Sequence, residues 1–117
     1  MLTGSVAAVM VHVPSVSEGL AWYERAFPSA KRAFVSNPDF EFLSLGDIRI
    51  EVVAADDKVA TGAAGSVVYW LVHDFEATLT HLLQLGAVIY RGPLNIEGGQ
   101  RMCQVRDPWG NCLGLRG

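Results

Sequence analysis

The chain has 117 residues, of which 50% are hydrophobic and 18% charged, and its formal net charge at pH 7 is −3. This length and composition predict one compact domain over residues 1–117 that buries about two-thirds of its unfolded surface. The acidic balance and the scattered basic residues argue against a nucleic-acid partner. No apolar run approaches the roughly 20 residues of a membrane-spanning helix, so a membrane partner is not expected either.

The N-terminal segment and the two cysteines bear on the cellular compartment of the protein. The apolar start, residues 1–13, carries no basic segment or cleavage signature, so we expect a mature strand and not a signal peptide. Cys103 and Cys112 flank a predicted turn, and two cysteines do not make a disulfide scaffold. CxxC is absent, which gives no support to structural zinc. A reduced, cytoplasmic protein is the expectation.

The first half of the chain predicts a β-α-β-β-β module over residues 1–53. Pro14 stops the first strand, Ser15 is placed as the helix N-cap with Glu18 completing a capping box, and Pro28 ends the helix. A turn is expected at 37–39, and a hairpin at Gly46 and Asp47. The expected strands are 6–13, 32–36, 40–45 and 48–53.

A link rich in Ala, Gly and Asp, residues 54–65, leads to a second module of the same kind over 66–117. Asp74 is placed as the cap of its helix and Gly86 as the residue that ends it. Residues 91–99 contain Gly-Pro and Gly-Gly pairs and predict a mobile loop. The turn Asp107-Pro108-Trp109-Gly110-Asn111 precedes the last strand. The expected strands are 66–73, 87–90, 100–106 and 112–116.

The two modules repeat in register. The separation from Val13 to Val72 is 72 − 13 = 59 residues, and that from Ser15 to Asp74 is 74 − 15 = 59. A register held in this way indicates an internal duplication. The fold class expected is therefore α+β, with two curved mixed sheets and the helices on their outer face.

Alternation along the strands separates an apolar face, expected to pack on the helices, from a mixed one. A concave apolar face with a few polar groups is typical of a small-molecule pocket. The alternatives are a subunit interface or plain surface. The candidate ligand-binding residues on the mixed face are Met10, His12, Arg49, Glu51, Tyr69 and His73.

The duplicated module, the helix sequence Trp22-Tyr23-Glu24-Arg25-Ala26-Phe27 and the Asp-Pro-x-Gly-Asn turn together resemble the vicinal oxygen chelate superfamily. This superfamily includes glyoxalase I, extradiol dioxygenases, fosfomycin-resistance enzymes and bleomycin-resistance proteins. The resemblance covers essentially the whole chain. It implies a ligand cup formed by curved sheet, and a homodimer.

In metal-dependent members, four side chains from strands one, four, five and eight hold the ion. The resemblance places these positions on Ala8, Glu51, Val67 and Gly114. Three of the four have no side-chain donor, whereas a catalytic divalent site needs about three protein ligands. His12 and His73 lie about 13–20 Å further along their strands and cannot replace them in place. No metal and no other cofactor is expected.

These observations favour a metal-free protein that binds a small organic molecule, as bleomycin-resistance-type members do by sequestering a drug or metabolite. The alternative is a glyoxalase-like lyase or dioxygenase with a rearranged site that uses Glu51 as a catalytic base, so the sequence leaves open whether the protein is an enzyme. Glu51 is equally compatible with an ion pair to Arg49. A third hypothesis is an interaction or effector-sensing module.

Overall fold

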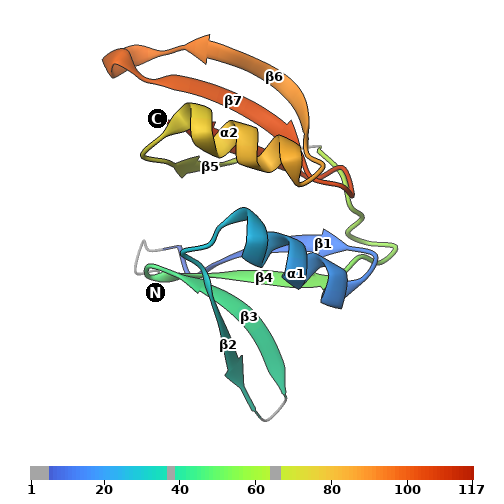
Figure 1. The fold of residues 1–117 in the computed structure, drawn as a ribbon. Helices are drawn as coiled ribbons and strands as arrows, with labels where there is room; N and C mark the ends of the chain where they lie inside the picture. Colours follow the sequence, from blue (N-terminus) through green and yellow to red (C-terminus); the bar gives the residue numbers. More distant parts are fainter. Residues whose placement is uncertain (1–5, 37–38, 64–66) are drawn as a thin grey trace. The chain divides into compact units, whose positions relative to one another are not determined.

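The computed structural model describes residues 6–36, 39–63 and 67–117, and it divides into two compact units, Met1–Ala60 and Thr61–Gly117. Each unit holds one α-helix and one four-stranded sheet (Figure 1). Both sheets are mixed and, over the described residues, neither closes into a barrel. The α+β fold expected from the sequence is confirmed.

The first unit runs in the order β1 (Ala8–Val13), α1 (Val16–Ala26), β2 (Lys31–Val35), β3 (Phe40–Leu45) and β4 (Ile48–Ala54). Its sheet has the strand order β1-β4-β3-β2, in which β1 and β4 are parallel and the other neighbours antiparallel. The parallel pair requires a crossover, and α1 begins that crossover.

The second unit repeats this topology with β5 (Val68–Leu71), α2 (Phe75–Gln84), β6 (Val88–Asn95), β7 (Arg101–Arg106) and β8 (Cys112–Arg116). The strand order is β5-β8-β7-β6, again with one parallel pair, β5 and β8. A short 3-10 turn, Glu97–Gly99, joins β6 to β7. The duplicated β-α-β-β-β organisation is confirmed.

The helices begin where their capping residues predict. Ser15 Oγ accepts a hydrogen bond from the Glu18 amide at 3.4 Å, and Asp74 Oδ1 accepts one from the Ala77 amide at 3.0 Å. These oxygens satisfy amides that a helix start leaves without partners. Gly86, with φ of 95°, ends α2 because it adopts a left-handed conformation that suits glycine.

The core of each unit lies between its helix and one face of its sheet. In the first unit, Val13, Ile50 and Val52 are 0–1% exposed, and Gly19 of α1 packs on Val13 and Val52. In the second unit, leucines of α2 and β8 form the buried faces, namely Leu79, Leu82, Leu113 and Leu115. Trp22 and Trp70 are buried packing residues.

The closing turn is built around a buried carboxylate. Asp107 is 4% exposed, and its Oδ1 accepts hydrogen bonds from the amides of Trp109 at 2.9 Å and Asn111 at 2.8 Å. The Asn111 side chain donates to Asp107 Oδ2 at 3.1 Å and accepts from the Gly62 amide at 3.0 Å. The Asp-Pro-x-Gly-Asn motif therefore has a structural role, because it sets the turn between β7 and β8.

Two expectations about loops and strands need correction. Residues 91–95 belong to β6 and are not loop, because register shifts between Ile89 and Leu94 let the strand continue through Gly92 and Pro93. Gly92, at φ of 83°, passes so close to the Met102 carbonyl that a Cβ would lie 2.9 Å from it. Only 97–99 forms a separate turn.

The strand expected at 66–73 ends earlier than predicted, and Ser66 at its start lies outside the described residues. The strand ends at Leu71, and His73 lies in a bend before the N-cap Asp74. The Val72 amide still donates to the Arg116 carbonyl at 2.9 Å, and the chain then bends at His73 into the helix cap. Part of the turn expected at 37–39 and part of the link 54–65 lie outside the described residues. None of the described helices is long and apolar enough to span a membrane.

Candidate functional site

Four of the predicted site residues share one face of the first sheet. The parallel register places Met10 beside Glu51, His12 beside Val53, and Ala8 beside Arg49. Because alternate strand residues point to the same side, Met10, His12, Arg49 and Glu51 lie opposite the buried face of Ile50 and Val52. Met10 is 53% exposed, which leaves apolar surface available on this face.

The polar centre of this face is an ion pair. Arg49 Nη1 lies 3.8 Å from Glu51 Oε2, and the two side chains are 44% and 17% exposed. The Arg49 guanidinium also stacks over Phe42 of β3, 4.1 Å from the ring centroid. Arg49 therefore contacts both an acidic and an aromatic neighbour, and Glu51 has a charged neighbour that accounts for a part-buried carboxylate. The pairing of Phe42 with Arg49 was not foreseen, because it depends on the register of β3.

His12 lies at the end of this face, next to the start of the link. It is half-buried and lies near Asp56 of this link. The amides of Val59 and Lys58 donate to Asp56 Oδ1 and hold the pKa of this carboxyl below its ordinary value, with a smaller contribution from His12. His12 therefore lies beside the turn that follows β4.

The second sheet presents a comparable face across β5, β8 and β7. One row runs Tyr69, Gly114, Gln104, and the next row runs Leu71, Arg116, Met102. The Tyr69 ring lies directly on Gly114, where a Cβ would be 2.5 Å from the ring carbon Cδ1. Tyr69 therefore fills the space above Gly114 that a side chain at this position would need.

Tyr69 is held by its neighbours on both sides. Gln104 Nε2 donates to the tyrosine hydroxyl at 2.7 Å, and Gln104 Oε1 lies 3.7 Å from Cys112 Sγ. The Arg116 guanidinium stands over the Tyr69 ring at 5.2 Å. Sequence reasoning proposed Tyr69 but missed Gln104 and Arg116, which only the cross-strand register brings to it.

The two cysteines are free thiols and do not meet. Cys103 is buried among the apolar residues of β7, and Cys112 is half-buried beside Gln104. Burial raises the pKa of both thiols above the ordinary value. A raised pKa leaves little thiolate near neutral pH, which argues against a thiol nucleophile.

His73 is the predicted site residue that the structure places differently. It is exposed in the bend after β5 and not on a strand face with Tyr69. Strand alternation suggested that His73 contacts a ligand together with Tyr69. Because His73 is not on the strand, this argument does not apply to it.

The residues at the four superfamily metal positions do not fit a metal centre. Ala8, Val67 and Gly114 carry no donor atom, Tyr69 covers Gly114, and Glu51 is paired with Arg49. Over residues 6–36, 39–63 and 67–117, no group of three or more His, Cys, Asp or Glu side chains is placed to hold an ion. A divalent site of the superfamily kind needs more donors than this set supplies.

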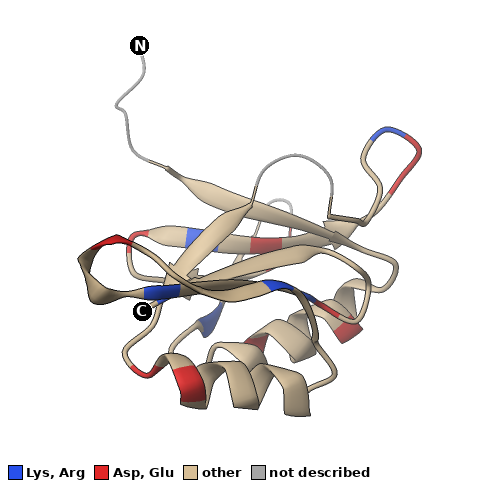
Figure 2. Ribbon diagram, turned by 90° about the horizontal axis from the view of Figure 1, so that it is seen from above, with Lys and Arg blue, Asp and Glu red and all other residues tan. Residues whose placement is uncertain are grey.

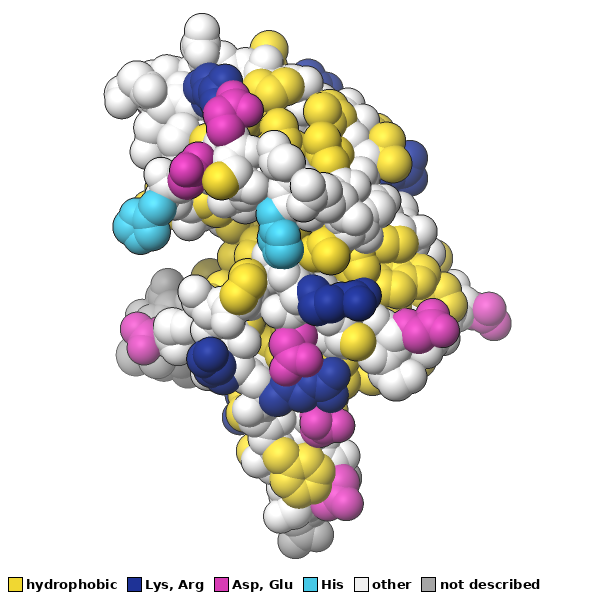
Figure 3. Space-filling view, in the orientation of Figure 1, with side chains coloured by type: hydrophobic (Ala, Val, Ile, Leu, Met, Phe, Trp, Pro, Cys, Tyr) yellow, Lys and Arg dark blue, Asp and Glu magenta, His cyan; other side chains and the backbone are white. Residues whose placement is uncertain are grey.

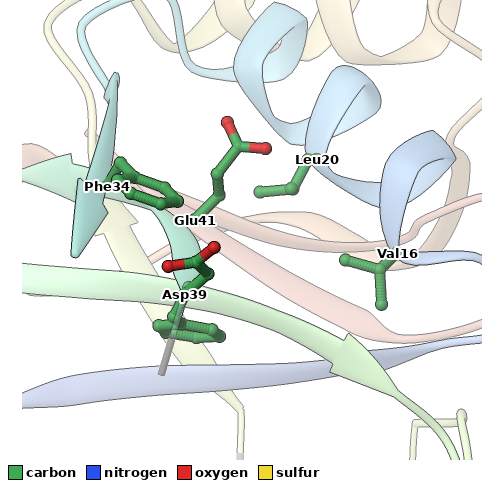
Figure 4. Close-up of a pocket in the computed structure, with 6 residues that line it drawn as sticks. Val16, Leu20, Phe34, Asp39 and Glu41 are labelled. Atoms are coloured by element: carbon green, nitrogen blue, oxygen red, sulfur yellow. The ribbon is translucent and has the colours of Figure 1, made fainter. Parts of the chain in front are cut away.

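A separate pocket lies on the helix side of the first sheet. It has a volume of about 310 Å³ between α1 and the β2–β3 hairpin (Figure 4). One carboxylate on its wall, Glu41, pairs with Arg32 at 3.5 Å. None of the predicted binding residues lines it. The lining residues are Val16, Leu20, Phe34, Asp39, Phe40 and Glu41.

Charges and apolar side chains are both spread over the surface. Figure 2 shows Lys and Arg of the described chain on several separate strands and a loop, without a basic stripe. Hydrophobic side chains reach the surface in both units (Figure 3). Among the described residues the most exposed of them is Leu71 of the edge strand β5, at 77%. Others lie on the edge strands β2 and β6, namely Phe34, Val35, Val88, Ile89, Tyr90 and Leu94.

Comparisons with known proteins give a result at the level of the fold. No protein-family model and no curated protein matches the chain. An integron cassette protein from the mobile metagenome of V. cholerae is 16% identical, with 99% of this chain and 96% of that chain covered and a TM-score of 0.76. A glyoxalase/bleomycin resistance protein/dioxygenase superfamily member from Sphaerobacter thermophilus is 16% identical, with 99% and 98% covered and a TM-score of 0.76.

The fosfomycin resistance protein FosX from Mesorhizobium loti is 18% identical to this chain, with 99% and 92% covered and a TM-score of 0.72. Identities this low establish a shared fold and not a shared activity. The chain has the vicinal oxygen chelate fold, and its structural neighbours include glyoxalase/bleomycin resistance proteins and FosX.

Proposed function

We propose that the protein is a metal-free small-molecule binding protein of the glyoxalase/bleomycin resistance type that sequesters a drug or metabolite. One observation carries the proposal. A chain with the vicinal oxygen chelate fold has donors removed at three of four metal positions, and at Gly114 the Tyr69 ring fills the space. Without these donors the fold cannot hold a metal ion as a Lewis acid, but the mixed sheet faces are still present.

The mixed sheet faces support ligand binding over plain surface. Each combines exposed apolar side chains, Met10 in the first unit and Leu71 in the second, with arginines held over aromatic rings. Apolar area with a few fixed polar groups is what a small organic ligand requires. The proposal includes a homodimer in the cytoplasm, with neither nucleic acid nor membrane as partner.

A thermal-shift screen tests the proposal. The purified protein, treated with a chelator, is heated with a library of metabolites and drugs. We expect at least one compound to raise Tm with a micromolar Kd that added divalent ions leave unchanged, because no ion takes part in binding. If no compound stabilises the protein, while added divalent ions stabilise it strongly, the proposal is wrong.

The second candidate is a glyoxalase-like lyase or dioxygenase that uses Glu51. It is favoured by the placement of Glu51 and His12 on one sheet face with the Glu51 side chain only 17% exposed. This candidate predicts turnover of hemithioacetals or catechols that Glu51→Gln abolishes. Turnover that persists in Glu51→Gln, or no turnover at all, counts against it.

A further inference from the structure

We propose that Arg116 recognises the carboxylate of an organic acid whose apolar body lies over Leu71 and Met102. This inference rests on the proposed small-molecule binding and names the chemical class of the ligand. Its basis is the arrangement of three adjacent strands, in which Leu71, Arg116 and Met102 form one row across β5, β8 and β7.

The hydrogen-bonding state of Arg116 sets it apart from two other arginines of the second unit. Arg101 forms an ion pair with Glu76, and Arg106 Nε donates to the Gly110 carbonyl at 3.2 Å. The Arg116 Nε is buried and, among the described residues, has no hydrogen-bond acceptor. No described side chain forms an ion pair with Arg116, and the terminal nitrogens of its part-exposed guanidinium are the donors that a ligand carboxylate would engage.

Tyr69 fixes the position of this charge. The guanidinium stands over the Tyr69 ring at 5.2 Å, while the ring rests on Gly114 and its hydroxyl is engaged by Gln104 at 2.7 Å. A side chain held in this way loses little freedom when it takes up a carboxylate. Arg116 itself keeps part of its surface exposed, so the group is within reach of a ligand.

The neighbours of Arg116 determine what the rest of the ligand must be. Leu71 is 77% exposed and Met102 is half-buried, so apolar surface lies on both sides of the charge. An acid with an aromatic or aliphatic body would cover this surface while its carboxylate meets the guanidinium. The ligand that matches the Arg116 charge and the apolar surface beside it is therefore an organic monoacid.

The test compares three probes that share one body and differ in the head group: 4-phenylbutyrate, 4-phenylbutanol and 4-phenylbutylamine. Binding is followed by amide shifts in NMR titrations of the full chain. We expect the acid to bind at least about tenfold more tightly than the alcohol, the effect of one charge-assisted hydrogen bond, and the amine to bind most weakly. The shifts should centre on β5 and β8.

Two variants locate the effect. Arg116→Gln should reduce the affinity for the acid about tenfold and leave the alcohol unaffected, while Arg116→Lys should retain part of the preference. The matched control is Arg25→Gln, which removes the same charge from an exposed position of α1 in the first unit and should change neither affinity. Unchanged thermal unfolding of Arg116→Lys shows that the fold is intact.

Three results would overturn the inference. Equal affinities for acid and alcohol, or retained acid binding in Arg116→Gln, would leave small-molecule binding standing and reject the charge recognition. Failure of all three probes to bind would reject this ligand class, and the library screen then decides the proposed function separately. Shifts that depend on protein concentration and not on probe would identify a second copy of the chain as the occupant of this face.

Discussion

At the scale of single residues, Gly114 and Tyr69 act as one unit. The closest neighbours of a Cβ built on Gly114 are three carbons of the Tyr69 ring at 2.5–2.7 Å, so any other residue at position 114 displaces the ring. Displacement would also break the contact of the tyrosine hydroxyl with Gln104 and the stacking of Arg116. Gly114 is therefore integrated into the packing of this sheet face.

Gly114→Ala should lower the free energy of unfolding by about 1–3 kcal/mol, the usual cost of inserting a methyl group into filled space. In a Tyr69→Ala background the same substitution should cost much less, because the obstructing ring is gone. Urea denaturation of the wild type, the two single variants and the double variant measures this coupling. Additive effects would show that the ring does not rest on Gly114.

At the scale of the elements, α1 depends on a glycine in its interior. Glycine is normally unfavourable there by about 1 kcal/mol relative to alanine. A Cβ on Gly19 would lie 2.7 Å from Val52 Cγ1 and 2.9 Å from Val13 Cγ2. The glycine therefore lets the helix approach the buried face of β1 and β4 closely.

Gly19→Ala should destabilise the protein by about 1–3 kcal/mol, because the steric cost exceeds the gain in helix propensity. Ser17→Ala, at an exposed position of the same helix, serves as the control and should change stability little. Thermal or urea unfolding measures both variants. A more stable Gly19→Ala variant would mean that α1 does not pack on Val13 and Val52 as described.

Elements with a local chemical signal could be predicted well from the sequence. Ser15 and Asp74 mark the two helix starts, and Phe40–Leu45 and Cys112–Arg116 are the strands expected. The continuation of β6 past Tyr90 was missed, because Gly92 and Pro93 normally interrupt a strand and only pairing with β7 accommodates them.

The candidate site could be predicted only in part, for a similar reason. Strand alternation places Met10, Arg49 and Glu51 on one face, because period-two patterning is local. Side-chain contacts between neighbouring strands depend on the register in which the strands pair. That register cannot be read from the sequence. Phe42 under Arg49, and Gln104 and Arg116 around Tyr69, are of this second kind.

At the scale of the whole molecule, the duplicated module determines the fold, and the residues substituted within it determine the chemistry. The offset of 59 residues that relates the two helix caps also relates Ala8 to Val67, since 67 − 8 = 59. Both of these positions lack a donor atom. The duplication thus repeats the sheets, and these two equivalent positions carry apolar side chains in both halves.

The most direct test of the proposed metal-free binding is the ion stoichiometry of the protein itself. Equilibrium dialysis against micromolar Mn²⁺ and Ni²⁺, followed by elemental analysis, gives moles of ion per mole of chain for the wild type and Glu51→Gln. We predict far less than one ion per chain in both proteins, because a single paired carboxylate cannot complete a divalent site. One ion per chain in the wild type, lost in Glu51→Gln, would contradict this account.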